Sequence, residues 1–106
     1  MSFASALTVT GDVATLRLTG ELDALTAPEF QRSIEQAAAV AVRRLVISLH
    51  ELEYISSAGL RCLIFARQTI HEGVTLALAG ARPAVARTIR MAGVDRGIDV
   101  TELADV

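Results

Sequence analysis

The order of strand-like and helix-like segments constrains the fold more than any other feature of this sequence. Apolar runs predict two strands within residues 7–18, a third at 44–49, a fourth at 74–79 and a short last strand at 98–100. Helical spacing predicts helices at 26–40, 57–72 and 83–92. Because strands and helices alternate after the first pair, we expect an α/β fold with a mostly parallel sheet. The Gly11-Asp12 pair predicts a hairpin that makes the first two strands antiparallel.

The junction between the third strand and the second helix, Tyr54–Arg61, carries two serines, an alanine and a glycine. Serine is favoured at a helix N-cap because its hydroxyl accepts a bond from an otherwise unpaired backbone N–H. The same place is the positive end of the helix dipole, where a phosphate is stabilised. The junction therefore predicts a helix start that could also be a regulatory site.

Two segments, Gly20–Leu25 and His50–Ser57, are expected to be loops that follow neighbouring strands. In open α/β sheets, functional groups gather beyond the C-terminal ends of the strands. We therefore expect both loops at one end of the sheet. Thr26 with Glu29 predicts a capping box for the first helix, and Gly73 and Gly93 predict the ends of the other two.

The second predicted helix has one apolar side and one mostly polar side. The apolar side is expected to hold Leu60, Leu63, Ile64 and Ile70. On the opposite side Phe65 stands out among Arg61, Gln68 and Glu72. Either another element covers Phe65, or it is a tolerated exposed residue, or it belongs to a partner-binding face beside the serines.

The bulk properties describe one domain, residues 1–106, with 52% hydrophobic and 21% charged residues. The net charge of −2 and the absence of a basic patch argue against nucleic-acid binding. The lone Cys62 excludes an intramolecular disulfide and suits a buried position in a reducing, cytoplasmic protein. No apolar run is long enough for a membrane span, so we expect no direct membrane insertion.

Enzymatic chemistry has little support in the sequence. Neither His50 nor His71 has a partner at metal-ligand spacing, and no phosphate-binding glycine loop is present, so no cofactor is expected. Ser57 lacks the preceding glycine of a nucleophile elbow. A small hydrolase built from Ser57, His50 and Asp23 stays a minor alternative; the main expectation is a protein that is not an enzyme.

The chain resembles the STAS domain, specifically the anti-sigma factor antagonist group. The resemblance rests on Gly20–Asp23, Leu45–Leu49, Tyr54–Leu60, Ala81–Arg87 and Met91–Val94, and so covers nearly the whole chain. It implies a mixed, mostly parallel sheet of four to five strands with helices mainly on one face. It also implies a partner-switching protein that binds an anti-sigma factor with serine-kinase activity. That kinase would phosphorylate the start of the second helix, and a serine phosphatase would reverse the modification.

The family pattern Asp-Ser-Ser/Thr-Gly-Leu, aligned on Gly59-Leu60, puts the usual phospho-acceptor at Ala58, which has no hydroxyl. Ser57 then becomes the first candidate for phosphorylation and Ser56 the second, unless both serines only cap the helix. The resemblance implies a partner-binding set of Glu21, Asp23, Ala58, Gly59, Arg61 and Phe65. The alternative is a non-phosphorylated STAS scaffold subunit of a membrane lipid-transport or signalling assembly. The oligomeric state is left open.

Overall fold

The computed structural model describes residues 3–94 and 98–102. Five strands form one sheet in the order β1-β2-β3-β4-β5, in which only β1 and β2 are antiparallel. The strands are β1 (Ala4–Thr10), β2 (Val13–Leu22), β3 (Arg44–Ile55), β4 (Thr75–Ala79) and β5 (Asp99–Glu102). The helices are α1 (Ala27–Ala38), α2 (Ser57–Thr69) and α3 (Pro83–Ala92). The predicted α/β class and the mixed, mostly parallel sheet are confirmed.

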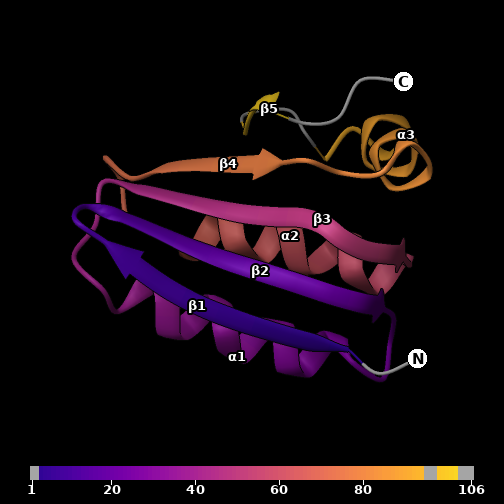
Figure 1. The fold of residues 1–106 in the computed structure, drawn as a ribbon, viewed down its shortest axis with the longest axis horizontal. Coiled ribbons are helices and arrows are strands. Elements are labelled where there is room, and N and C mark those ends of the chain that lie inside the picture. The colour runs from indigo at the N-terminus through magenta and orange to yellow at the C-terminus, as the bar shows by residue number, and fades with distance from the viewer. Residues whose placement is uncertain (1–2, 95–97, 103–106) are drawn as a thin grey trace.

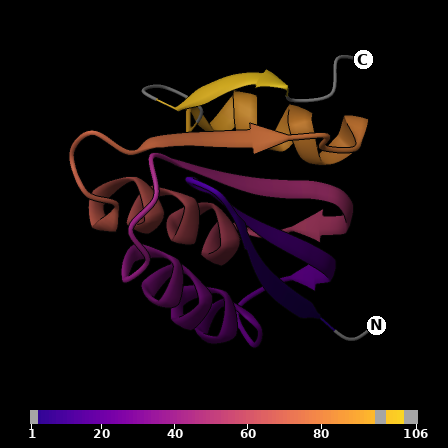
Figure 2. The ribbon, with the colours of Figure 1, turned by 60° about the vertical axis from the view of Figure 1, so that its left-hand side comes forward.

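Helices α1 and α2 lie side by side on one face of the sheet, as Figures 1 and 2 show. Leu16, Ile47 and Leu78 are matched across β2, β3 and β4, and all three are fully buried. Phe30 of α1 and Leu63 of α2 are fully buried in the same core. Helix α3 follows β4 and lies toward the end of that strand, where Figure 1 shows it end-on. The predicted placement of helices mainly on one face is therefore confirmed.

Strands β2 and β3 are longer than the sequence predicted. Residues 20–22 belong to β2 and residues 50–55 belong to β3, so most of the two expected loops is strand. The β2–β3 register shifts between Arg17 and Thr19 and again between Gly20 and Glu21, which are β-bulges in β3. Each bulge adds a residue, so the buried positions Leu49, Leu52 and Ile55 are three residues apart instead of two. That spacing does not match the alternation expected of a strand, and the prediction of loops was wrong for residues 20–22 and 50–55.

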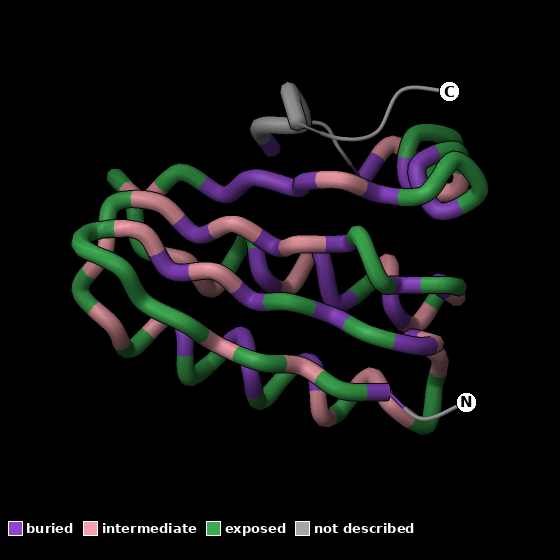
Figure 3. The backbone as a smooth tube through the Cα atoms, in the orientation of Figure 1, coloured by how far each residue is buried: buried purple, intermediate pink, exposed green. Residues whose placement is uncertain are grey.

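The hairpin of β1 and β2 was predicted correctly. Gly11, with φ +61°, takes the first position of its two-residue turn, and seven consecutive residue pairs follow without a register shift. Strand β1 is mostly exposed along its length, as the tube in Figure 3 shows. Val9 is the most accessible large apolar side chain of this strand, with 45% of its surface exposed.

The helix ends follow the expected glycines only in part. Gly93, with φ +70°, caps α3 as predicted. Helix α2 ends earlier, at Thr69, and Gly73 lies in the turn that follows. Thr26 precedes α1, but its side chain makes no capping bond to the helix, so the predicted capping box does not form. No helix in residues 3–94 has the length and apolarity needed to cross a bilayer.

Candidate functional site

The ends of β2 and β3 lie next to each other and bring the two predicted site segments together. Leu22 is matched with Ile55 in the parallel ladder, and the backbone N–H of Ser56 donates to the carbonyl of Leu22 at 2.9 Å. Asp23 and Ser56 are therefore the first residues beyond two adjacent strands. The two segments were expected at one end of the sheet, and this arrangement is present even though residues 20–22 and 50–55 are strand.

Ser56 and Ser57 have different roles at the start of α2. Ser56 is the N-cap: its side-chain oxygen accepts from the N–H of Gly59 at 3.4 Å, and its carbonyl accepts from the N–H of Leu60 at 2.9 Å. Ser57 is the first residue of the helix and is exposed. Within residues 3–94 and 98–102, the hydroxyl of Ser57 makes no hydrogen bond. Of the two serines, Ser57 is therefore the one whose hydroxyl is available.

Gly59 is buried where α2 meets the strand ends. A Cβ atom at Gly59 would lie 2.7 Å from a side-chain carbon of Ile55 and 2.8 Å from one of Leu22. Contacts this short are not tolerated without movement of the neighbours, so the absence of a side chain lets α2 begin close to the sheet. In the structure, Gly59 serves to let α2 pack closely against Ile55 and Leu22.

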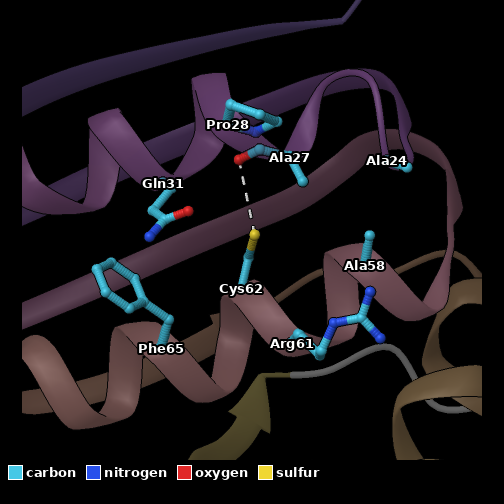
Figure 4. A pocket seen from close by; sticks show the side chains of 8 residues that line it. All are labelled: Ala24, Ala27, Pro28, Gln31, Ala58, Arg61, Cys62 and Phe65. Atoms are coloured by element: carbon cyan, nitrogen blue, oxygen red, sulfur yellow. Dashed lines mark hydrogen bonds between the residues drawn. The ribbon is translucent and has the colours of Figure 1, made fainter.

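A groove of about 380 Å³ runs between the N-terminal halves of α1 and α2. Three of the predicted partner-binding residues, Ala58, Arg61 and Phe65, line it from α2, as Figure 4 shows. Its other lining residues are Cys62 of α2 and, from α1 and the preceding loop, Ala24, Ala27, Pro28 and Gln31. Glu21 and Asp23 are not part of this lining. They lie at the nearby end of β2, where both are half-buried.

The groove exists because both helices follow parallel strands. The C-terminal ends of β2 and β3 point the same way, so α1 and α2 start at the same end of the sheet and run in the same direction. The sequence analysis considered the faces of α2 alone and missed the contribution of α1. Ala27 and Gln31 are one turn apart on α1, and such spacing would have identified them once the two helices were placed side by side.

Phe65 is half-buried and packs against the core beside α1, while still lining the groove. Another element therefore covers Phe65 in part, which was one of the alternatives predicted for this residue. The buried side of α2 is Gly59, Cys62, Leu63 and Ala66, whereas Leu60, Ile64 and Ile70 are only half-buried. The apolar side predicted from helical spacing is thus rotated, because α2 packs against α1 as well as against the sheet.

The thiol of Cys62 bridges the two helices. Its Sγ donates to the carbonyl of Ala27 at 3.6 Å, and only 6% of the residue surface is exposed. Burial raises the pKa of this thiol above its ordinary value of 9.0, and the positive charge of Arg61 opposes the rise only in part. Cys62 therefore stays protonated at neutral pH, and its role here is structural.

Arg61 provides positive charge near the exposed serine. It lies four residues after Ser57, which is one helical turn, and its side chain extends back toward Ala58 and the start of α2 (Figure 4). The first turn of α2 contains no acidic residue. The helix dipole and the guanidinium group therefore both favour an anion at this end of α2.

Asp23 fixes the loop that connects β2 to α1. Its Oδ1 accepts from the N–H of Leu25 at 3.0 Å and from the N–H of Thr26 at 3.2 Å. Thr26 Oγ1 in turn donates to the carbonyl of Glu21 at 3.0 Å and accepts from the N–H of Asp23 at 2.9 Å. Leu25 is thereby held outward with 90% of its surface exposed.

The described part of the chain contains no group of three or more acidic, cysteine or histidine side chains close enough together to bind a metal ion.

A mixed five-stranded sheet with two helices on one face, and a serine-capped helix at the end of its central strand, defines a STAS domain. The sequence matches the STAS domain family over residues 4–104, and the chain belongs to that family. It is 30% identical over 100 residues to the anti-sigma-F factor antagonist RsfB of Mycobacterium tuberculosis. That similarity covers 91% of this chain and 82% of RsfB. The resemblance to STAS anti-sigma factor antagonists is thus confirmed.

Solved structures show the same fold. An anti-sigma factor antagonist from Mycobacterium paratuberculosis is similar with a TM-score of 0.85 and 26% identity, over 92% of this chain and 83% of that one. The anti-sigma factor antagonist SpoIIAA of Bacillus, in its unphosphorylated form, has a TM-score of 0.74. At 23% identity, over 95% of this chain and 90% of SpoIIAA, the second similarity concerns the fold alone.

Proposed function

We propose that this STAS domain, taken as one domain over residues 1–106, is an anti-sigma factor antagonist. It binds an anti-sigma factor that is also a serine kinase, and reversible phosphorylation of Ser57 controls the binding. A serine phosphatase restores the binding form. The relative RsfB and the M. paratuberculosis protein carry the same description, which supports the role. Because an anti-sigma factor acts on transcription, the proposal places the protein in the cytoplasm, as a regulator and not an enzyme.

One observation carries the proposal: Ser57 is exposed, makes no hydrogen bond within the described residues, and occupies the first position of α2 beside the groove. A phosphate there adds about −1.5 to −2 charges and considerable bulk. The dipole of α2 and Arg61 can hold that phosphate without a change of fold. The modification therefore acts on docking by local charge and size.

The docking surface in this proposal has two parts. The groove residues Ala58, Arg61 and Phe65 form the first, and the end of β2 with Glu21 and Asp23 forms the second. The exposed side chain of Leu25 lies in the loop between them and offers an apolar contact. Gly59 contributes by its packing, which sets the position of Ser57.

The direct test is phosphorylation by the anti-sigma factor kinase that this proposal requires. Intact-mass analysis after incubation with that kinase and ATP should show the addition of one phosphoryl group, and peptide mapping should locate it at Ser57. The Ser57→Ala variant should gain no mass, whereas Ser56→Ala should still be modified. Modification at Ser56 alone would contradict the assignment of Ser57.

Ala58 favours one alternative. It stands directly before Gly59, where the family pattern has its usual acceptor hydroxyl. A STAS scaffold subunit of a membrane lipid-transport or signalling assembly would need no acceptor there. In that case the mass of the protein stays unchanged with every kinase tested, and affinity purification from the source cells recovers membrane-assembly subunits instead of an anti-sigma factor.

A further inference from the structure

Strand β1 forms one edge of the sheet. It pairs with β2 on one side only, and the order of strands leaves its other side without a neighbour among the described residues. Figure 1 shows β1 at the outer margin of the sheet, above α1. An edge strand presents unpaired backbone N–H and C=O groups, which can pair with a further strand.

The hairpin turn determines which backbone groups face outward. Thr10 and Val13 flank a two-residue turn, so they exchange both backbone hydrogen bonds. In an antiparallel ladder, hydrogen-bonded and non-hydrogen-bonded pairs alternate. The backbone N–H and C=O groups of Ala4, Ala6 and Thr8 therefore point toward β2, like those of Thr10. The backbone groups of Ser5, Leu7 and Val9 point away from β2.

Strand β1 lacks three of the features that usually prevent edge pairing. Natural edge strands carry charged side chains, proline or bulges. The seven residues of β1, ASALTVT, contain no charge and no proline, and the ladder with β2 is free of register shifts. The strand is thus uncharged over its whole length and regular in its pairing with β2.

We propose that β1 pairs in antiparallel fashion with β1 of a second copy of this chain, with the two-fold axis at Leu7. Leu7 then lies opposite the partner's Leu7, and Ser5 opposite the partner's Val9. These are the residues whose backbone groups point outward, so each pair can exchange both of its hydrogen bonds. The two sheets become one continuous sheet across the dimer.

A second copy suits this edge for reasons of chemistry and pattern. In this register Leu7 meets its own copy and Ser5 meets the partner's Val9, and because β1 carries no charge, no like charges are opposed. A two-fold axis at Leu7 pairs odd-numbered residues of one copy with odd-numbered residues of the other. Side chains on the helix-covered face of one sheet therefore meet side chains on the same face of the partner's sheet. Val9, which is 45% exposed, gains a neighbour there. The helix α2 and the groove are not used.

The interface is small. A seven-residue edge buries less than the about 1,200 Å² typical of stable complexes, so we expect a reversible dimer of modest affinity. Sedimentation velocity from roughly 10 μM to 1 mM covers that range of affinity. The wild-type protein should change from monomer to dimer across these concentrations.

Paired charge variants test the register. Ala6 and Thr8 are both exposed. When the axis is at Leu7, Ala6 of one copy lies opposite Thr8 of the other. In the Ala6→Lys/Thr8→Lys variant, lysines oppose lysines, and in Ala6→Glu/Thr8→Glu, glutamates oppose glutamates. Each variant alone should dimerise about tenfold more weakly or worse. An equimolar mixture should form a heterodimer, since every opposed pair is then lysine with glutamate.

Thr19→Lys is the matched control, because Thr19 is exposed on β2, away from the edge. It should dimerise like the wild type, and circular dichroism should show that all variants are folded. A wild-type protein that remains monomeric at the highest concentration would overturn the proposal. So would charge variants that self-associate like the wild type, or a mixture that forms no heterodimer.

Discussion

The N–H of Ser56 donates to the carbonyl of Leu22 at 2.9 Å, which joins the cap of α2 to the strand that leads into α1. A single backbone bond thus relates the starts of the two helices that form the groove. Because both helices depend on it, the position of Ser57 relative to Ala27 and Pro28 is set by the ends of the strands. The sheet therefore determines the geometry of the proposed docking surface.

Ser57→Asp should weaken binding to the anti-sigma factor by about tenfold or more, or ~1.4 kcal/mol, because it places a negative charge at the exposed first residue of α2. Ser57→Ala should bind like the wild type, since the hydroxyl makes no hydrogen bond within the described residues. Isothermal titration calorimetry against the unmodified partner measures both. Equal affinities of the two variants would exclude control by charge at this residue.

Gly59→Ala should lower the free energy of unfolding by about 1–3 kcal/mol, because the added methyl group would overlap with Ile55 and Leu22. Urea denaturation followed by circular dichroism measures this change. Ala58→Gly, at the adjacent half-buried position, is the matched control for a small substitution in the first turn and should cost less than about 1 kcal/mol. If Gly59→Ala were as stable as the wild type, the close approach of α2 to the strands would be refuted.

Asp23→Ala should destabilise the protein by about 1–2 kcal/mol, because it removes the Oδ1 atom that accepts hydrogen bonds from the backbone N–H groups of Leu25 and Thr26. Asp23→Asn keeps an acceptor oxygen and should cost less than about 0.5 kcal/mol. Comparing the two variants separates the effect of Asp23 on stability from its effect on binding to the partner. A stable Asp23→Asn protein that still loses affinity for the partner would show that the carboxylate charge contacts the partner.

Cys62 should make stability fall at high pH. Burial raises the pKa of the folded thiol above 9.0, so the folded protein holds the proton more tightly than the unfolded chain does. The resulting stability is fully present below the unfolded pKa and is lost as pH rises through the folded pKa. Unfolding free energies measured from pH 7 to 10.5 should therefore decline less steeply for Cys62→Ala than for the wild type. Identical slopes would contradict the raised pKa.

The class of fold and the order of strands and helices along the chain could be predicted from the sequence because most segments have clear periodicity. Leu16, Leu18, Leu45 and Ile47 alternate with more exposed residues, and Phe30 and Ile34 recur at helical spacing. These patterns come from residues that face one core across regular structure, so local sequence carries the information.

The ends of β2 and β3 could not be predicted in the same way. Leu49, Leu52 and Ile55 face the core through two bulges, and bulges are specified by pairing with β2, not by the local residues. Thr26 has the right identity for a cap, but its hydroxyl bonds to Glu21 instead. The predicted partner-binding set included Ala58, Arg61 and Phe65, which line the groove, but it contained no residue of α1.

The two bulges in β3 also restrict how the chain length can vary between Leu49 and Ser56. In a surface loop, the loss or gain of one residue is usually accommodated. Here it would exchange the inward and outward side chains of a paired strand and move the Ser56 N–H away from the carbonyl of Leu22. A relative with one residue more or fewer in this segment should therefore differ in the position of its α2 serines.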